Sequence, residues 1–398
     1  MPRQTPFHSR TSALCQGESW QDWSGFLSPT MYELDHIHEY NSIRMGCGLF
    51  DISPLFKYFV RGRDAETLLN RIVTRDISKC RVGQVIYTAW CDDAGKIIDD
   101  GTVARLSEDS FRMTAAIPTL YWLQDNAFGL EVEIEDASDA YGGLALQGPT
   151  SRDLLQQITD ADLSKLGYFR IVDTKVGGVP ASVSRTGYTG DLGYEIFVTP
   201  QNAETLWDAL VAKGIDYKMQ PAGNVALDMT RIEAGLLLID VDFQSAAKAM
   251  FEVEKTSPYD LGLDWMVKLE KGFFVGQEAL RREKARGPAW TTVGLEVDVQ
   301  GLEKLYSQFS MPLHLPYQSW NTAVPVYADD EKRQHIGRAT SGTWSPVLKR
   351  YVVIARVKPQ HAQLGRRIYL EETIEAQRFA APATVVPMPF FDPPRKKA

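Results

Sequence analysis

Apolar side chains recur at every second residue between Val85 and Ala89, which predicts a β-strand. Residues 92–95, Asp-Asp-Ala-Gly, are typical of a turn, and residues 97–103 resume as the hairpin partner. Asp99 and Asp100 lie inside this second strand, so their side chains must point to opposite faces of the sheet. One carboxylate then faces the interior, where either an ion pair or a functional role has to offset the cost of burying a charge.

A second pair of predicted strands, residues 181–185 and 194–198, is joined by a turn that is rich in glycine. Without a Cβ atom, the turn glycines would let the backbone approach a ligand closely. The ring of Tyr188 offers a flat face, and the carboxylate of Glu195 can accept two parallel N–H bonds from a heterocycle. The same spacing also fits an ordinary hairpin with turn glycines. The glycines are Gly187, Gly190 and Gly193.

Helical periodicity appears between and after these hairpins. Residues 32–40 read as a helix, and a second helix covers residues 64–72, with Asp64 in position to cap its N-terminus. A third helix begins after Pro221 and ends before Gly235, which suits a C-terminal cap. Two more helices are predicted at residues 202–212 and 277–286.

The Gly287-Pro288 pair ends the last of these helices and marks a predicted domain boundary between residues 1–286 and residues 287–398. Six short strands follow in roughly a hundred residues, which predicts a small antiparallel barrel. The basic tail, residues 393–398, is expected to be disordered. The predicted strands are residues 292–297, 325–327, 336–341, 351–357, 367–370 and 383–387.

Composition narrows the function classes. A chain of 398 residues with 44% hydrophobic residues can bury the cores of two or three domains. Its net charge of −8 argues against a nucleic-acid partner. Four scattered cysteines and the isolated pair His36 and His38 suggest neither disulfides nor a metal site. With no apolar run long enough to span a bilayer, we expect a cytoplasmic protein without membrane contact.

The segment from Ser19 to Tyr32 is unusually aromatic, with Trp20 and Trp23 among polar residues. Such residues often fix a chain terminus to a core, which is the simpler interpretation. The alternative is an aromatic wall of a binding pocket.

The turn sequence identifies a resemblance. Residues 185–196, Arg-Thr-Gly-Tyr-Thr-Gly-Asp-Leu-Gly-Tyr-Glu-Ile, resemble the signature of the aminomethyltransferase family, which includes the folate-binding T-protein of the glycine cleavage system. Residues 145–149 and 228–235 resemble two more family motifs, and the similarity extends from about residue 31 to residue 391. It implies an α+β cloverleaf: two interleaved α+β lobes in residues 1–286 and a C-terminal antiparallel β-barrel that closes over a tetrahydrofolate channel.

The resemblance also implies roles for individual residues. In the family, the glutamate at the position of Glu195 grips the pterin ring, and the tyrosines at Tyr188 and Tyr87 lie near the folate. Asp100 matches an aspartate at the reactive edge of the folate and is the expected catalytic residue. Arg231 matches an arginine that holds either its helix or the folate tail.

The chain departs from the family motifs at several positions. Gly101 replaces a leucine after the two aspartates, which should widen the space beside Asp100; Leu227 replaces an arginine, and Pro54 replaces a histidine. The changes at Gly101 and Pro54, together with the divergent residues 22–26, favour a small free donor over a lipoyl arm. The change at Leu227 removes one cationic contact of the family. The chain has no Gly-x-Gly-x-x-Gly motif, so we expect no flavin module of its own.

Three functions follow from the resemblance. The favoured one is a tetrahydrofolate-dependent demethylase that takes a methyl group from nitrogen, sulfur or oxygen of a small molecule. The second is the aminomethyltransferase itself, working with a lipoyl carrier protein. The third is a non-catalytic folate-binding protein of iron–sulfur assembly, which would not need Asp100. Aromatic candidates for the donor pocket are Trp20, Trp23, Tyr32 and Trp90.

Overall fold

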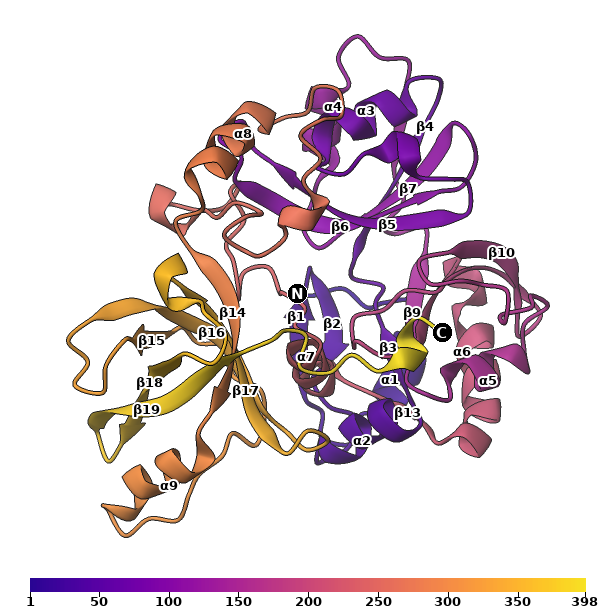
Figure 1. Cartoon of the computed structure of the whole chain (residues 1–398). Coiled ribbons are helices and arrows are strands. Elements are labelled where there is room, and N and C mark those ends of the chain that lie inside the picture. Colours follow the sequence, from indigo (N-terminus) through magenta and orange to yellow (C-terminus); the bar gives the residue numbers. More distant parts are fainter.

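The hairpin predicted at residues 85–103 forms one edge of a five-stranded antiparallel sheet in the computed structural model, which describes residues 1–398 (Figure 1). Helices α3 (Ala65–Ile72) and α4 (Leu120–Asn126) pack apolar side chains on one face of this sheet. The strands, in spatial order, are β5 (Gln84–Cys91), β6 (Ile97–Arg105), β7 (Ser110–Ala115), β4 (Phe56–Arg61) and β8 (Glu133–Asp136).

A six-stranded sheet forms the second lobe. It takes β3 from before the first lobe and its other strands from after it, so the two lobes are interleaved in sequence as predicted. Only β13 and β3 run parallel. The strands, in spatial order, are β10 (Ile171–Val176), β11 (Val179–Ser184), β12 (Gly193–Val198), β9 (Gly142–Gln147), β3 (Cys47–Asp51) and β13 (Met219–Pro221).

Two groups of helices cover this second sheet. On one face, Leu154, Leu206 and Trp207 of the first group pack with the strand residues in one core. On the other face, Tyr40 and Met229 of the second group form a smaller core. The first group is α1 (His8–Leu14), α5 (Ser151–Gln156) and α6 (Ala203–Gly214), and the second is α2 (Ile37–Met45) and α7 (Asn224–Glu233); a short ribbon of β1 (Trp20–Trp23) and β2 (Phe26–Pro29) lies near the N-terminus.

The predicted barrel is present and closed. All six predicted strands are formed, so the fold class is confirmed; helix α9 (Val299–Ser307), between the first two of them, was not predicted. Helix α8 (Gln277–Arg286) precedes the barrel. Around the barrel the strands are β14 (Thr291–Val297), β17 (Arg350–Val357), β16 (His335–Ser345), β15 (Val324–Tyr327), β18 (Arg367–Ile374) and β19 (Gln377–Val386).

Side-chain hydrogen bonds explain why the N-terminal ends of two helices differ from their predictions. The helix expected at residues 32–40 begins only at Ile37, because the Glu39 carboxylate accepts the backbone N–H groups of Tyr32 and Glu33 and holds them outside the helix. Asp64 precedes α3 but does not cap it, since its carboxylate accepts the N–H of Glu131 instead.

The end of α7 agrees with its prediction. Gly235 has a φ of +63°, and its N–H bonds to the carbonyl of Ile232. The N–H of Leu236 bonds to the carbonyl of Arg231. This pair of bonds is the usual glycine-dependent end of a helix.

The C-terminal tail is ordered against the second lobe, which corrects the expectation of disorder. Residues 394–396 form a single helical turn, and the Arg395 guanidinium makes two hydrogen bonds of 2.7 Å to the buried Asp191 carboxylate. Arg152 and Arg185 donate to the carbonyl of Ala398. Composition shows the basic charge of the tail, but the buried acidic partner becomes apparent only in the fold. No helix anywhere in the chain has both the length and the apolar character to cross a membrane.

Candidate functional site

A cavity of about 1560 Å³ lies where the two lobes and the barrel meet. The hairpin of β5 and β6 forms one wall, β9 and β12 contribute a second, and residues of β14 and β19 reach it from the barrel. Typical small-molecule sites have volumes of roughly 300–1,000 Å³. This cavity is therefore larger than a typical site for one small molecule.

Asp99 and Asp100 point to opposite faces of β6, as their adjacency requires. Asp99 is fully buried and accepts hydrogen bonds from the backbone N–H groups of Asp100, Ala116 and Ile117 at 2.8, 2.9 and 3.0 Å. The inward carboxylate is thus held by N–H donors and not by an ion pair. Asp100 lines the cavity.

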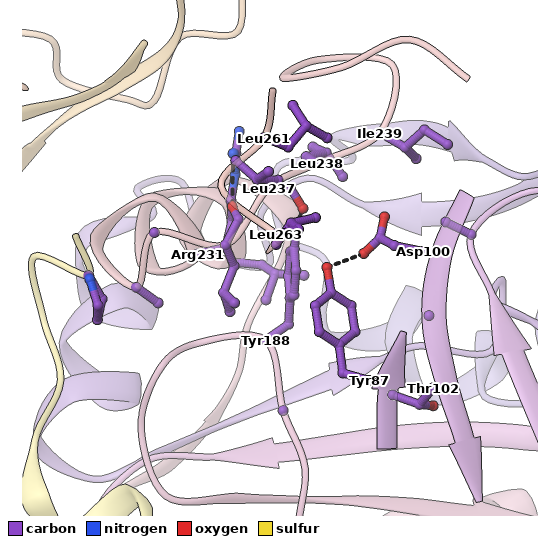
Figure 2. Close-up of a pocket in the computed structure, with 18 of the residues that line it drawn as sticks. Tyr87, Asp100, Thr102, Tyr188, Arg231, Leu237, Leu238, Ile239, Leu261 and Leu263 are labelled. Atoms are coloured by element: carbon purple, nitrogen blue, oxygen red, sulfur yellow. Dashed lines mark hydrogen bonds between the residues drawn. The ribbon is translucent and has the colours of Figure 1, made fainter. Parts of the chain in front are cut away.

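The hydroxyl of Tyr87 donates a hydrogen bond to the carboxylate of Asp100, and Figure 2 shows the two side chains pointing toward each other. Burial raises the pKa of Asp100 above the ordinary range of an aspartate, while the Tyr87 bond opposes that rise. Burial also raises the pKa of Tyr87, so its hydroxyl stays protonated and remains a donor. The pair presents one carboxylate whose basicity exceeds that of a solvated aspartate.

Glu195 on β12 also lines the cavity, from the second lobe. Its carboxylate accepts one hydrogen bond, 2.7 Å long, from the hydroxyl of Thr186. Burial raises its pKa, and the Thr186 bond and the charge of Arg112 oppose this rise. The other carboxylate oxygen makes no hydrogen bond within the protein, so it is free to accept a donor from a ligand.

Tyr188 lies in the same cavity and is fixed by a hydrogen bond from its hydroxyl to the carbonyl of Leu237. Burial raises the pKa of this hydroxyl, which keeps it protonated. The bond anchors the edge of the ring and leaves its face available for packing against a flat ligand.

Sequence comparison agrees with this geometry. The family described as the GCVT N-terminal domain matches residues 8–271, and the glycine cleavage T-protein C-terminal barrel domain matches residues 316–392. The chain belongs to the aminomethyltransferase family. The predicted resemblance and the predicted class, an enzyme among folate-dependent transferases, are thereby confirmed.

Relatives that are similar to this chain carry the names of different enzymes. An aminomethyltransferase of Caldanaerobacter subterraneus is 36% identical over 87% of this chain and 86% of that protein. Trimethylamine-oxide aldolase of Ruegeria pomeroyi is 35% identical over 100% of this chain, which spans only 48% of that longer protein. The crystal structure of aminomethyltransferase T from Bartonella henselae has a TM-score of 0.83 at 24% identity, over 98% of this chain and 99% of that one, and so shares the fold.

Of the four aromatic residues predicted for the donor pocket, only Trp23 lines the cavity. Trp20 is three positions away on β1, so it faces the other way and packs on the ring of His8, 5.2 Å between centroids. Trp90 is 0% exposed in the core of the first lobe, again three positions from a cavity residue, Tyr87. Tyr32 is buried in the core of the second lobe. Because side chains alternate between the two faces of a strand, Trp20 and Trp90 point away from the cavity, and the prediction that they line it is wrong.

Arg231 is 0% exposed and makes its hydrogen bonds within the protein. Its guanidinium donates to Asp228 at 2.7 Å, to Asp242, to Ser341 at 2.9 Å and to Asn321 at 3.1 Å. Because Ser341 lies on β16, the arginine ties α7 to the barrel. Of the two roles that the family resemblance left open, these contacts favour holding the helix.

Three glycines that the sequence predicted to give a ligand room also have roles in packing the chain. A Cβ on Gly187 or Gly193 would lie 1.9 or 2.3 Å from Oε1 of Gln147, so both glycines make room for that side chain, and Gly187 also lines the cavity. A Cβ on Gly101 would lie 2.0 Å from the carbonyl oxygen of Thr114. Gly101 therefore lets β7 approach β6 closely, and its missing side chain does not widen the cavity.

Two cavity residues escaped the sequence analysis. The ring of Trp265 lies with its centroid 6.2 Å from that of Tyr87, and the Arg75 guanidinium lies 5.4 Å from the centroid of the Trp265 ring. Both residues line the cavity. Trp265 occupies a variable position of the segment 262–269, which resembles a family motif, and Arg75 lies outside the motifs, so only the fold brings the two residues together at the site.

Proposed function

We propose that this family member is a tetrahydrofolate-dependent methyltransferase that demethylates a small methylated substrate. The observation that carries the proposal is the placement of the Asp100 carboxylate, bonded to Tyr87, in a cavity that also contains Tyr188 and the half-bonded Glu195. Its cytoplasmic location belongs to the same proposal, and the four buried free cysteines agree with a reducing compartment.

The residues present fit tetrahydrofolate. A pterin ring carries neighbouring N–H donors at one edge, and the free oxygen of the Glu195 carboxylate, next to the one bonded by Thr186, is an acceptor for that edge. The aromatic ring of Tyr188, which lines the same cavity, suits packing against the flat pterin ring. When bound, tetrahydrofolate supplies the nitrogen nucleophile that accepts the one-carbon unit.

Asp100 would act on the proton of that transfer. As the carbon–nitrogen bond forms and the bond between the methyl group and its old partner breaks, the nucleophilic nitrogen must lose a proton. An Asp100 carboxylate oxygen accepts it, and its raised pKa makes it a better acceptor than a solvated aspartate. The electron pair of the broken bond leaves with the donor, which departs as a neutral amine or sulfide if it was a cation. Tyr87 holds the carboxylate in place through its hydrogen bond.

A small free donor is supported by two observations. Pro54 stands where T-proteins have a histidine, and residues 22–26 diverge from them as well. In addition, a relative that matches the whole chain is named for trimethylamine oxide, a small methylated nitrogen compound. The widening once expected at Gly101 gives no support, because that glycine serves strand packing.

The alternative is an aminomethyltransferase that works with a lipoyl carrier protein. It is favoured by the name of the Caldanaerobacter relative, which aligns over most of both chains. A non-catalytic folate-binding protein of iron–sulfur assembly is a weaker candidate. That role would need Glu195 and Tyr188 but gives no use to the Asp100 and Tyr87 pair.

The proposal is tested by incubating the protein with tetrahydrofolate and a panel of methylated amines, sulfonium compounds and methyl ethers, followed by mass spectrometry of the folate products. The proposal expects 5-methyltetrahydrofolate from one class of donor. Formation of 5,10-methylenetetrahydrofolate, only with a lipoyl carrier that bears an aminomethyl group, would favour the alternative.

A further inference from the structure

Five basic side chains line the cavity, and four of them are paired with carboxylates. Arg231 bonds to Asp228 and Asp242. The next three are lysines: Lys248 pairs with Asp240, and Lys396 and Lys397 both pair with Asp392. Arg75 is the fifth, and no carboxylate is in ion-pair contact with it or contributes to its pKa.

The protein holds the backbone of Arg75 firmly. Its N–H donates to the hydroxyl of Thr88 at 3.2 Å, and its carbonyl accepts a hydrogen bond of 2.6 Å from the ammonium group of Lys271. The guanidinium lies over the Trp265 ring, 5.4 Å from its centroid, and that ring is 47% exposed. The side chain therefore projects from a rigid base toward the cavity.

The guanidinium of Arg75 makes few hydrogen bonds within the protein. Its hydrogen bond is a long one, 3.5 Å from Nη1 to the carbonyl of Tyr87, and the remaining N–H groups have no acceptor in the chain. Burial lowers the pKa of Arg75, and no neighbouring carboxylate offsets this effect. A half-buried cation that has no counter-ion within the protein is stabilised when an anion binds beside it. The planar guanidinium fork matches a carboxylate in particular.

Tyr87 connects this cation to the catalytic aspartate. Its carbonyl touches Arg75, its ring lies beside Trp265, and its hydroxyl bonds to Asp100. A ligand anchored on Arg75 thus lies along the same strand wall as the carboxylate that takes up the proton. Glu195, the proposed pterin anchor, belongs to the other lobe.

We propose that Arg75 binds a carboxylate of the methyl donor, so that the substrate class is a methylated ammonium or sulfonium compound that also carries a carboxylate. This inference rests on the proposed function and specifies its donor. During transfer, the bond from the methyl carbon to the cationic nitrogen or sulfur breaks, and its electron pair remains on that atom. The new bond forms to the folate nitrogen, whose proton passes to Asp100. The carboxylate is unchanged and keeps the donor on Arg75 throughout.

The test measures binding by titration calorimetry without folate. The probes are two pairs of compounds that differ in the carboxylate: trimethylglycine against choline, and dimethylsulfonioacetate against its methyl ester. The variants are Arg75→Met, Arg75→Lys and, as a matched control, Arg63→Met, which removes an arginine that is 73% exposed on the same lobe. The far-UV circular dichroism spectrum and the thermal unfolding midpoint, measured in parallel, report that each variant is folded.

We expect the wild type and Arg63→Met to bind the carboxylate member of a pair at least about tenfold more tightly. Arg75→Met should bind both members equally, and Arg75→Lys should retain part of the preference. Equal affinities in the wild type, or a preference that survives in Arg75→Met, would overturn the proposal.

A second arm separates the donor from the glutamate of the folate as the source of the carboxylate. Tetrahydropteroate lacks that glutamate. If Arg75→Met abolishes the preference for tetrahydrofolate over tetrahydropteroate and leaves the donor pairs unaffected, Arg75 serves the folate and the donor assignment is wrong. Carboxylate binding that depends on Arg75 but yields no 5-methyl product with any donor would support the Arg75 site and contradict the demethylase function, so the two failures are distinguishable.

Discussion

The hydroxyl of Tyr87 on β5 reaches the carboxylate of Asp100 on β6 across the hairpin. The register pairs Ala89, not Tyr87, with Asp100, so the bond runs diagonally between two residues on the same face of the sheet. Asp99 pairs with Trp90, and both lie in the interior of the first lobe. One strand thus gives its two adjacent carboxylates entirely different surroundings.

The two aspartates should therefore respond differently to the same substitution. Asp100→Asn keeps the shape but removes the proton acceptor, so kcat should fall about 100-fold or more while folate affinity changes little. Asp99→Asn weakens the acceptor of three backbone N–H groups and should lower the free energy of unfolding by about 1.5–3 kcal/mol. Steady-state kinetics of both variants measure the change in kcat, and urea denaturation of both measures the change in the free energy of unfolding. A loss of turnover in a stable Asp99→Asn protein would mean that the roles are reversed.

Activity should depend on pH through Asp100. Its carboxyl group must be ionised to accept a proton, and burial raises its pKa, so kcat should fall as the pH drops through a value well above the roughly 3.9 of a solvated aspartate. Tyr87→Phe removes the hydrogen bond that opposes the rise and should shift this acidic limb to higher pH. A limb that stays at the same pH in Tyr87→Phe would show that another group is titrating.

Glu195 should control folate affinity. Glu195→Ala removes the free acceptor oxygen, and the affinity for tetrahydrofolate should weaken by about 1.5–3 kcal/mol, the usual contribution of hydrogen bonds to a charged group. Glu135→Ala is the control, because Glu135 lies on the edge strand β8 in an exposed ion pair. Calorimetric titration of both proteins with tetrahydrofolate checks the expectation; equal affinities would remove Glu195 from the pterin site.

The two tryptophans of β1 provide an internal comparison. Trp23→Leu removes an aromatic face from the cavity and should lower kcat/KM for a cationic donor about tenfold, or roughly 1.4 kcal/mol. Trp20→Leu removes the contact with His8 and should cost only about 0.5–1.5 kcal/mol of stability. If Trp23→Leu retains full kcat/KM, the N-terminal segment serves only to fix the terminus.

The fold was largely accessible from the sequence because its signals are local. The β5–β6 hairpin, the end of α7 at Gly235 and the six barrel strands each follow from a short pattern of alternation or turn residues. Side-chain direction was less accessible. The residue type of Trp90 suits a pocket, but alternation along β5 turns its side chain to the buried face, opposite Tyr87.

The residues missed altogether depend on distant contacts. Arg75 and Trp265 are 190 positions apart, and no local pattern predicts that one will cover the other. The order of the tail likewise depends on distant partners: Asp191 in the glycine-rich turn, and the arginines Arg152 and Arg185. Ion pairs and cation–π contacts between residues far apart in the sequence produce no periodic pattern from which they could be predicted.

The central claim, methyl transfer to tetrahydrofolate, is tested most directly by the fate of isotopic label. The protein is incubated with tetrahydrofolate and a donor whose methyl group carries three deuterium atoms, and the folate product is examined by mass spectrometry, with Asp100→Asn as the inactive control. Intact transfer predicts 5-methyltetrahydrofolate that retains all three deuterium atoms. A 5,10-methylene product that carries two deuterium atoms would contradict the account, because the carbon would then have been transferred as a methylene group.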